Sequence, residues 1–240
     1  MVFEDSPQGL FLYLRGGKAM FNKLKAKSLR NMGNENFKKG NYQEAIADYE
    51  KSIKLNLHNS TAFNNLGVAY ENLNKFENAE YYYKKAIQVS GNDPNPYINL
   101  IQLYEGKTEY LKALEICSQV WGKYSPTDEF FEGVLNLCEK GLKDTSEDSP
   151  DQYQLLNYQV FAFQRLRKFP EAIESCKRLI ERSFDTIRKH IAYNQLATLC
   201  HQAGLHEKAI EHYKTVKALE EEIPCNMHTS KELMKILQTK

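Results

Sequence analysis

The sequence predicts an all-α protein in which antiparallel helix pairs repeat along the chain. Its 240 residues include only 7 prolines and 12 glycines, while helix-favouring Lys, Glu, Leu and Ala are abundant. A small residue returns at a near-constant spacing of 34 or 37 residues within the two halves of the chain. A larger residue follows each alanine after one helical turn, on the same helix face. The alanines are Ala45, Ala79, Ala113, Ala172 and Ala209. The residues one turn later are Tyr49, Tyr83, Cys117, Cys176 and Tyr213.

Charge and cysteine content exclude several classes of protein. With 32 basic and 31 acidic residues, the net charge is about +1, which gives no global attraction to nucleic acid. The longest apolar run, LFLYL at 10–14, is too short to span a bilayer, and Glu4 and Asp5 argue against a signal peptide. The odd number of widely spaced cysteines indicates reduced thiols, so we expect a cytoplasmic protein. They are Cys117, Cys138, Cys176, Cys200 and Cys225.

The elements follow in order along the chain. Residues 1–25, with the apolar stretch QGLFLYL, are expected to form an N-terminal extension or cap. Residues 26–144 are expected to hold three helix pairs and an amphipathic capping helix at 128–144. An acidic, proline-bearing linker is expected at 145–152. Residues 153–240 are expected to hold two further pairs and a C-terminal capping helix in TSKELMKILQTK. The five pairs are placed at 26–59, 60–93, 94–127, 153–186 and 190–223.

An alternative organisation remains open at this stage. The helix at 128–144 carries Phe131, Leu135, Cys138 and Leu142 on one face. It closes a first module in the economical interpretation. In the other, it is one extra helix within an unbroken stack.

The second unit, FNNLGVAYENLNKFENAEYYYKKAI, resembles the tetratricopeptide repeat (TPR), which couples an aromatic, a Leu-Gly pair and a Tyr to a later Ala and aromatic. The resemblance implies a right-handed TPR solenoid of antiparallel helix pairs, with five repeats plus capping helices. The small residues then lie where two helices touch. Ile101 and Val160 replace the small residue found as Gly33, Gly67 and Ala197, so two interhelix contacts are expected to be looser.

No residue pattern indicates catalysis. The sequence has no phosphate-binding glycine loop, HExxH motif or paired-cysteine metal spacing, so neither an enzyme nor a cofactor is expected. His201, His206 and His212 are spaced so that their imidazoles are not expected on one face. Cys117, Cys176 and Cys200 occupy packed positions of the repeat, which favours core thiols over nucleophiles.

Three asparagines spaced by 34 residues are candidates for binding a peptide. The resemblance places the first helix of each repeat on the concave face, where Asn31, Asn65 and Asn99 would form a ladder. Amides can pair with the main chain of an extended peptide whatever its sequence. The alternatives are that asparagine is simply frequent in this repeat, or that the amides bridge adjacent helices.

A sharper candidate is the carboxylate clamp of TPR co-chaperones, which grip the acidic C-terminus of Hsp70 or Hsp90. The stretch LRNMGNENFKKGNYQEA resembles the first clamp helix, with Arg30 where the family has a lysine. Asn34 and Asn65 match the two clamp asparagines. Asn95 and Asn99 stand where the family has two cations, so the resemblance implies only a partial clamp.

Residues 15–39 carry eight cations and a single acid, Glu35. This asymmetry indicates either a solvated helix face or a basic rim that attracts an acidic peptide or, less readily, a membrane surface. Lys27 and Lys38 join Arg30 as candidate binding residues on this interpretation.

The predicted function is a non-enzymatic adaptor or scaffold that holds a protein or peptide partner in the concave groove. Besides the co-chaperone, two alternatives remain: a chaperone for secreted bacterial proteins, and a structural subunit of a large assembly. Exposed convex aromatics such as Tyr81 and Tyr82 would support the structural subunit. The sequence leaves the oligomeric state and the partner's identity open.

Overall fold

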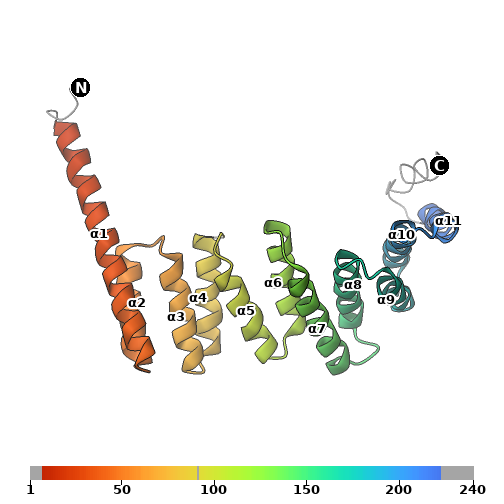
Figure 1. The fold of residues 1–240 in the computed structure, drawn as a ribbon, viewed down its shortest axis with the longest axis horizontal. Coiled ribbons are helices and arrows are strands. Elements are labelled where there is room, and N and C mark those ends of the chain that lie inside the picture. The colour runs from red at the N-terminus through yellow and green to blue at the C-terminus, as the bar shows by residue number, and fades with distance from the viewer. Residues whose placement is uncertain (1–6, 91, 223–240) are drawn as a thin grey trace. The chain divides into compact units, whose positions relative to one another are not determined.

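The structure is a computed structural model that describes residues 7–90 and 92–222, with side chains from 17 to 220 apart from residue 91. Within this range the chain forms eleven helices and no strand (Figure 1). None of these helices is both long and apolar enough to cross a membrane. The predicted C-terminal helix in 229–240 lies outside the described residues. The helices are α1 (Pro7–Lys38), α2 (Tyr42–Leu55), α3 (Ser60–Asn72), α4 (Phe76–Val89), α5 (Asn95–Gly106), α6 (Tyr110–Lys123), α7 (Asp128–Asp144), α8 (Pro150–Arg165), α9 (Phe169–Glu181), α10 (Thr186–Gln202) and α11 (His206–Glu222).

The chain divides into two compact units after Gly106, between α5 and α6. In the first unit α1 packs against α2, α3 packs against α4, and α2 and α4 contact the helices that follow them. The first helices also touch one another, because α1 contacts α3 and α3 contacts α5. These three helices therefore form one continuous face of the first unit.

In the second unit each helix from α6 to α11 contacts the next along the chain. Helix α7 contacts both α6 and α8, and rings from all three helices meet around Trp121. The loop before α8 is tied down, since the Gln152 amide donates to the carbonyl oxygens of Leu142 (3.2 Å) and Thr145 (3.0 Å). Helix α7 is thus part of one stack within this unit.

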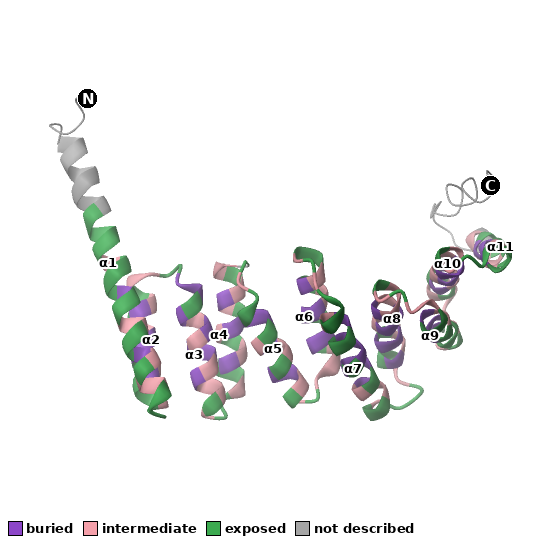
Figure 2. Cartoon of the chain, in the orientation of Figure 1, coloured by how far each residue is buried: buried purple, intermediate pink, exposed green. Residues whose placement is uncertain are grey.

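Each helix pair of the first unit is held by a close contact between a glycine and a tyrosine. A Cβ atom added at Gly33 would lie 2.5 Å from Cε1 of Tyr49, and one at Gly67 would lie 2.5 Å from Cε1 of Tyr83. Such distances leave no room for a side chain, so α1 and α3 approach their partner helices only because these positions are glycine. The periodic alanines Ala45 and Ala79 are completely buried. Figure 2 shows buried residues along the helices of the first unit, interspersed with exposed ones.

At the corresponding helix contacts of the second unit, side chains of other sizes are paired. Ala197 and Tyr213 lie sixteen residues apart, as Gly33 and Tyr49 do, and share one buried cluster. Val160 and Cys176, also sixteen apart, belong to that cluster and are buried too. The larger first residue, Val160, is thus accompanied by a smaller second one, Cys176, and the looser contact expected at Val160 stays a prediction.

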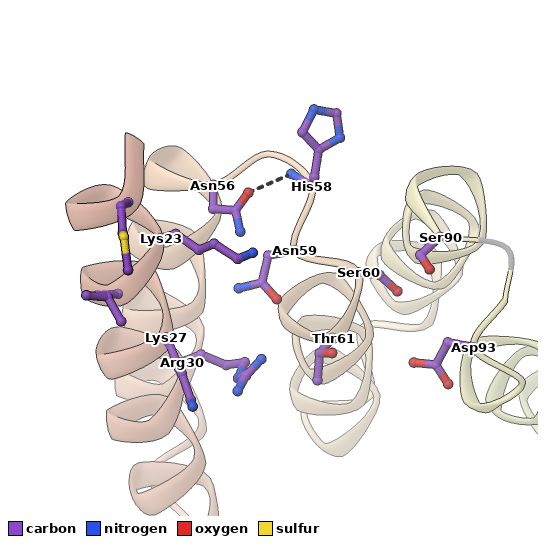
Figure 3. A pocket seen from close by; sticks show the side chains of 12 residues that line it. Lys23, Lys27, Arg30, Asn56, His58, Asn59, Ser60, Thr61, Ser90 and Asp93 are labelled. Atoms are coloured by element: carbon purple, nitrogen blue, oxygen red, sulfur yellow. Dashed lines mark hydrogen bonds between the residues drawn. The ribbon is translucent and has the colours of Figure 1, made fainter. Parts of the chain in front are cut away.

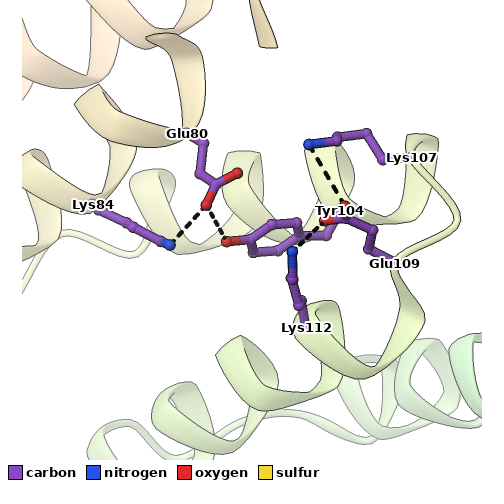
Figure 4. A network of polar contacts seen from close by, with 6 residues as sticks. All are labelled: Glu80, Lys84, Tyr104, Lys107, Glu109 and Lys112. Atoms are coloured by element: carbon purple, nitrogen blue, oxygen red, sulfur yellow. Dashed lines mark hydrogen bonds and ion pairs between the residues drawn. The ribbon is translucent and has the colours of Figure 1, made fainter. Parts of the chain in front are cut away.

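Hydrogen bonds add polar ties between and within the helices. In the first unit the Tyr104 hydroxyl of α5 donates to Glu80 of α4 at 2.9 Å, and Lys84 lies 2.8 Å from the same carboxylate (Figure 4). In the second unit Glu109 pairs with Lys112 at 3.1 Å (Figure 4). Exposed ion pairs of this kind stabilise little, so the buried contacts carry most of the stability.

Because one unit pairs a glycine with a tyrosine where the other pairs a valine with a cysteine, two substitutions that convert the first pair into the second should partly offset each other's loss of stability. Gly67→Val should destabilise by about 1–3 kcal/mol through overpacking, and Tyr83→Cys by about 3 kcal/mol through the space it leaves. The double variant should be more stable than the sum predicts, by about 0.5 kcal/mol or more. Urea unfolding of the four proteins measures this coupling.

The matched control combines Gly67→Val with Tyr213→Cys, a tyrosine of the second unit in the α10–α11 helix pair. Those two effects should add. If both double variants are simply additive, the glycine–tyrosine contact does not set the helix spacing.

Candidate functional site

One side of α1 presents a row of polar side chains toward α3. Spaced by three or four residues, they occupy a single stripe of the helix. The row consists of Lys23, Lys27, Arg30, Asn34 and Lys38. Two hollows lie between this stripe and α3, and we call them the cationic hollow and the amide pocket.

The cationic hollow has a volume of about 580 Å³. Lys23 and Arg30 extend from α1 toward Asn59 and Thr61 at the start of α3, with Lys27 beside them (Figure 3). The full lining is Met20, Lys23, Leu24, Lys27, Arg30, Asn56, His58, Asn59, Ser60, Thr61, Ser90 and Asp93. Two of the predicted binding residues, Lys27 and Arg30, therefore meet here. Lys23 is one of the eight cations in residues 15–39 but is not among the predicted binding residues, because only the structure shows which cations converge.

The amide pocket, of about 260 Å³, is built around Asn34. The Oδ1 atom of Asn34 accepts hydrogen bonds from the Tyr49 hydroxyl (2.9 Å) and from the Asn65 side-chain amide (2.8 Å). These two bonds fix the orientation of the Asn34 amide, whose own NH₂ group has no acceptor in the described part of the chain. Phe37, Lys38 and Val68 complete the lining. The pocket thus offers an oriented donor group beside a lysine.

Burial controls the ionisation of Tyr49 in this pocket. It raises the pKa of Tyr49 to about 12, against the opposing effects of the Asn65 hydrogen bond and the positive charge of Arg30. Tyr49 therefore stays a neutral hydrogen-bond donor at physiological pH.

The three asparagines spaced by 34 residues are not equivalent. Asn65 donates to Asn34, and Asn99 donates to Asn64 at 3.0 Å, so both bridge adjacent first helices. Asn31 is exposed and makes no such bridge. Asn65 and Asn99 therefore bridge adjacent helices, as the alternative interpretation of the asparagines proposed. The three asparagines do not form a ladder of equivalent side chains.

The second unit continues the bridging with a different donor. The Gln195 amide of α10 donates to Oδ1 of Asn157 in α8 at 3.0 Å. Sequence analysis missed this link because it compared asparagine with asparagine, and here glutamine supplies the donor. The three bridged pairs lie 31, 35 and 38 residues apart, so a search at the fixed repeat spacing could not find them.

The remaining candidates lie at the edges of the site. Lys38 is exposed and pairs with Glu35 at 3.0 Å, although it also lines the amide pocket. The Asn95 amide donates to Asp93 at 2.9 Å, within its own loop. These residues surround the two hollows but do not converge on one atom.

The histidines and cysteines of the second unit have packing or surface roles. His201 and His206 meet across the α10–α11 turn, with 3.2 Å between their Nδ1 atoms, which corrects the prediction for this pair. The ring of His212 lies against Tyr193, so the three imidazoles do not share one face, as predicted. In the described residues no group of three metal-ligating side chains converges. Burial raises the pKa of Cys176 to about 12, which keeps this thiol neutral and unreactive.

The unequal asparagines predict a rank order of stability. Asn99→Ala leaves the buried Asn64 oxygen without a donor and should cost about 1–3 kcal/mol. Asn65→Ala should cost less, roughly 0.5–1.5 kcal/mol, because Asn34 retains the Tyr49 bond. Asn31→Ala should change stability by less than about 0.5 kcal/mol. Thermal unfolding of the three single variants tests the order, and equal midpoints would contradict the bridging role.

The buried phenol predicts loss of stability at alkaline pH. Because the pKa of Tyr49 is raised from 10.0 to about 12 on folding, its contribution is complete below pH 10 and falls between pH 10 and 12. Tyr49→Phe should therefore show a shallower decline over this window in urea unfolding. An identical decline in both proteins would show that Tyr49 ionises as in the unfolded chain.

Comparison with known proteins agrees with this architecture. A family model described as TPR repeat matches residues 33–74, and models described as tetratricopeptide repeat match 60–93 and 190–222. The first match covers the stretch that carries Gly33, Asn34 and Tyr49.

Curated relatives and solved structures carry the same repeat. The chain is 30% identical over 104 residues to the Hsp70-Hsp90 organising protein of Plasmodium falciparum, which is 40% of this chain and 41% of that protein. It is 33% identical over 99 residues to RNA polymerase II-associated protein 3 of Rattus norvegicus, covering 38% and 15%. The alignments thus span less than half of either relative.

Among solved structures, the first TPR of Spaghetti (RPAP3) bound to the HSP90 peptide SRMEEVD is 24% identical, with a TM-score of 0.44. That likeness covers 49% of this chain and 95% of that one. The periodic helix pairs and the three matched repeat models establish that the chain is a tetratricopeptide repeat protein.

Proposed function

We propose that this chain is a non-enzymatic interaction adaptor that holds the terminal carboxylate of a partner peptide between α1 and α3. One observation carries the proposal: Asn34 is fixed by two hydrogen bonds so that its NH₂ group remains a free donor, one turn from Arg30. A carboxylate has two acceptor oxygens and one charge, which an amide and a guanidinium can satisfy together.

The name of one relative supports a finer form of the proposal. The organising protein of Plasmodium falciparum is named for Hsp70 and Hsp90, and its likeness motivates a chaperone tail as the partner. Such an adaptor would act as a co-chaperone in the cytoplasm. The buried cysteine thiols of the second unit are compatible with a reducing compartment.

The site lacks two cations of a full carboxylate clamp, and their absence limits which parts of a peptide it can bind. Where the family has two further cations, the Asn95 amide binds Asp93 and the Asn99 amide binds Asn64. Neither side chain can neutralise an acidic residue upstream in the peptide. The terminal carboxylate is therefore the part of such a ligand that this pocket suits.

The structural-subunit alternative gains little from the aromatic residues offered for it. Tyr82 stacks on Tyr70 with ring centroids 5.3 Å apart and is only partly accessible. Tyr81 alone of that pair is largely exposed, at 55%.

Binding of a defined peptide tests the proposal. SRMEEVD should bind the full chain, and amidation of its C-terminus should weaken binding by about tenfold or more, because a hydrogen bond to a charged group is lost. Arg30→Ala should weaken the free-acid peptide to a similar extent. Isothermal titration calorimetry measures each affinity.

Lys25→Ala is the matched control, because Lys25 is an exposed cation of the same helix that lines neither hollow. It should change affinity by no more than about twofold, as expected for a solvated charge. Equal binding of the acid and amide peptides would exclude a carboxylate site. If Lys25→Ala weakened peptide binding as much as Arg30→Ala, Arg30 would contribute only through its charge and not through a specific contact.

A further inference from the structure

Helix α1 is much longer than the helix that it packs against. It has 32 residues and α2 has 14, and both belong to the first unit. The Ser52 hydroxyl, in the last turn of α2, donates to the carbonyl oxygen of Ala26 at 2.7 Å, so α2 ends beside this part of α1. Toward its N-terminus α1 therefore continues beyond the end of α2 (Figure 1).

Met20, Phe21 and Leu24 of α1 form a stripe of exposed apolar side chains, which we call the apolar stripe. They are 66%, 63% and 58% exposed, so more than half of each residue stays accessible even though Met20 and Leu24 also line the cationic hollow. Apolar residues also recur in the sequence at Leu10 and Leu14, eleven and seven residues before Phe21, the spacing of one helix face. Contiguous exposed apolar residues of this kind mark interaction surfaces.

The apolar stripe points away from the helix pair. Ala26 is completely buried and Gly33 lies against Tyr49 of α2, so these two positions, seven residues apart, mark the face of α1 that packs on α2. At about 100° per residue, Phe21 and Leu24 point about 140–160° away from Ala26. The contacts within the helix pair therefore leave the apolar stripe uncovered.

Lysines border the apolar stripe on both sides. By helical spacing, Lys18 and Lys25 lie on one side, and Lys23 and Lys27 lie on the other. All four are exposed, and residues 17–28 contain no acid. Lysine side chains can lie along an apolar surface while their ammonium groups stay at its polar edge. Apolar residues flanked by cations are typical of a helix that lies in the interface of an anionic membrane.

We propose that this part of α1 binds the surface of a membrane that contains anionic lipids. The apolar stripe enters the boundary between headgroups and acyl chains, and the flanking lysines contact the negatively charged headgroups. The charges favour this occupant over a second copy of the chain, because pairing two such helices would bring like charges together. The inference goes beyond the proposed function, since binding to a membrane requires no peptide.

Vesicle flotation with the full chain tests the inference. Vesicles made of equal parts phosphatidylcholine and phosphatidylserine should bind the protein. Vesicles of phosphatidylcholine alone should bind it at least about tenfold less tightly, because the lysines are attracted only to a charged surface. Absence of binding to the mixed vesicles would overturn the proposal, and equal binding to both would overturn the role of the lysines.

Two pairs of apolar substitutions separate the apolar stripe from general hydrophobicity. Phe21→Ser with Leu24→Ser should weaken binding to the mixed vesicles by about tenfold or more, because less apolar area leaves water. Phe184→Ser with Ile187→Ser is the matched control, since these residues of the second unit are 69% and 47% exposed. It should change the affinity by no more than about twofold. Equal losses in the two pairs would overturn the assignment of the stripe.

Two pairs of lysine substitutions test the charges in the same assay. Lys18→Ala with Lys25→Ala should weaken binding to the mixed vesicles by about tenfold or more. Lys38→Ala with Lys39→Ala removes the same charge from exposed positions at the other end of α1, and should change the affinity by no more than about twofold. Equal losses would show attraction by net charge alone and would overturn the site.

A tryptophan in the apolar stripe reports whether the side chain leaves water. The emission of Phe21→Trp should move to shorter wavelength on the mixed vesicles and should be quenched by brominated lipids. The wild-type protein is the control, because its single tryptophan, Trp121, belongs to the second unit, and its emission should not change. Vesicle binding without a change in the emission of Phe21→Trp would overturn insertion of the stripe.

The other possible occupants give different results. A dimer in sedimentation equilibrium that Phe21→Ser with Leu24→Ser abolishes, without vesicle binding, would assign the apolar stripe to a second copy of the chain. A monomer that binds no vesicle would overturn the membrane in favour of a protein partner. Binding of SRMEEVD without vesicle binding would overturn this inference alone, whereas vesicle binding without SRMEEVD binding would overturn only the carboxylate proposal.

Discussion

The contact between Gly33 and Tyr49 determines the geometry of the first unit. The Tyr49 ring fits against α1 only because position 33 lacks a side chain, and the hydroxyl of the same residue donates to Asn34. One side chain therefore fixes both the spacing of two helices and the orientation of an amide in the candidate site. Packing and recognition are linked here by a single residue, so neither can change alone.

The amides illustrate how a repeat divides structural and binding work. Asn65 and Asn99 each use one side-chain N–H group to hold one first helix against the next, and that N–H is then not available to a peptide. Asn34 accepts one of these bonds, from Asn65, and a second from the Tyr49 hydroxyl, so its own NH₂ group stays free. The side-chain oxygen of Asn34 therefore helps to hold α3 against α1, and the NH₂ group of the same side chain is left for a ligand.

Much of the fold could be predicted from the sequence, because periodic alanines and aromatics report directly on helix contacts. The pairing of Val160 with Cys176 could not, since size compensation depends on which side chains oppose one another across a helix pair. The role of Lys23 was equally hidden. The position of Lys23 depends on how α1 lies against the start of α3, and Ser52 of α2 links the two, since it donates to the carbonyl oxygen of Ala26 and accepts from the Asn59 amide.

The size-matched contacts have a consequence for how such a chain can change over time. Both members of each pair lie sixteen residues apart, inside one helix pair, in Gly67 with Tyr83 as in Val160 with Cys176. Duplication or loss of a whole repeat carries both members together and preserves the fit. Recombination within a repeat joins a glycine to a cysteine or a valine to a tyrosine, leaving a void or a clash. Viable crossovers, in nature or in engineered chimeras, are therefore expected to fall in the turns between repeats.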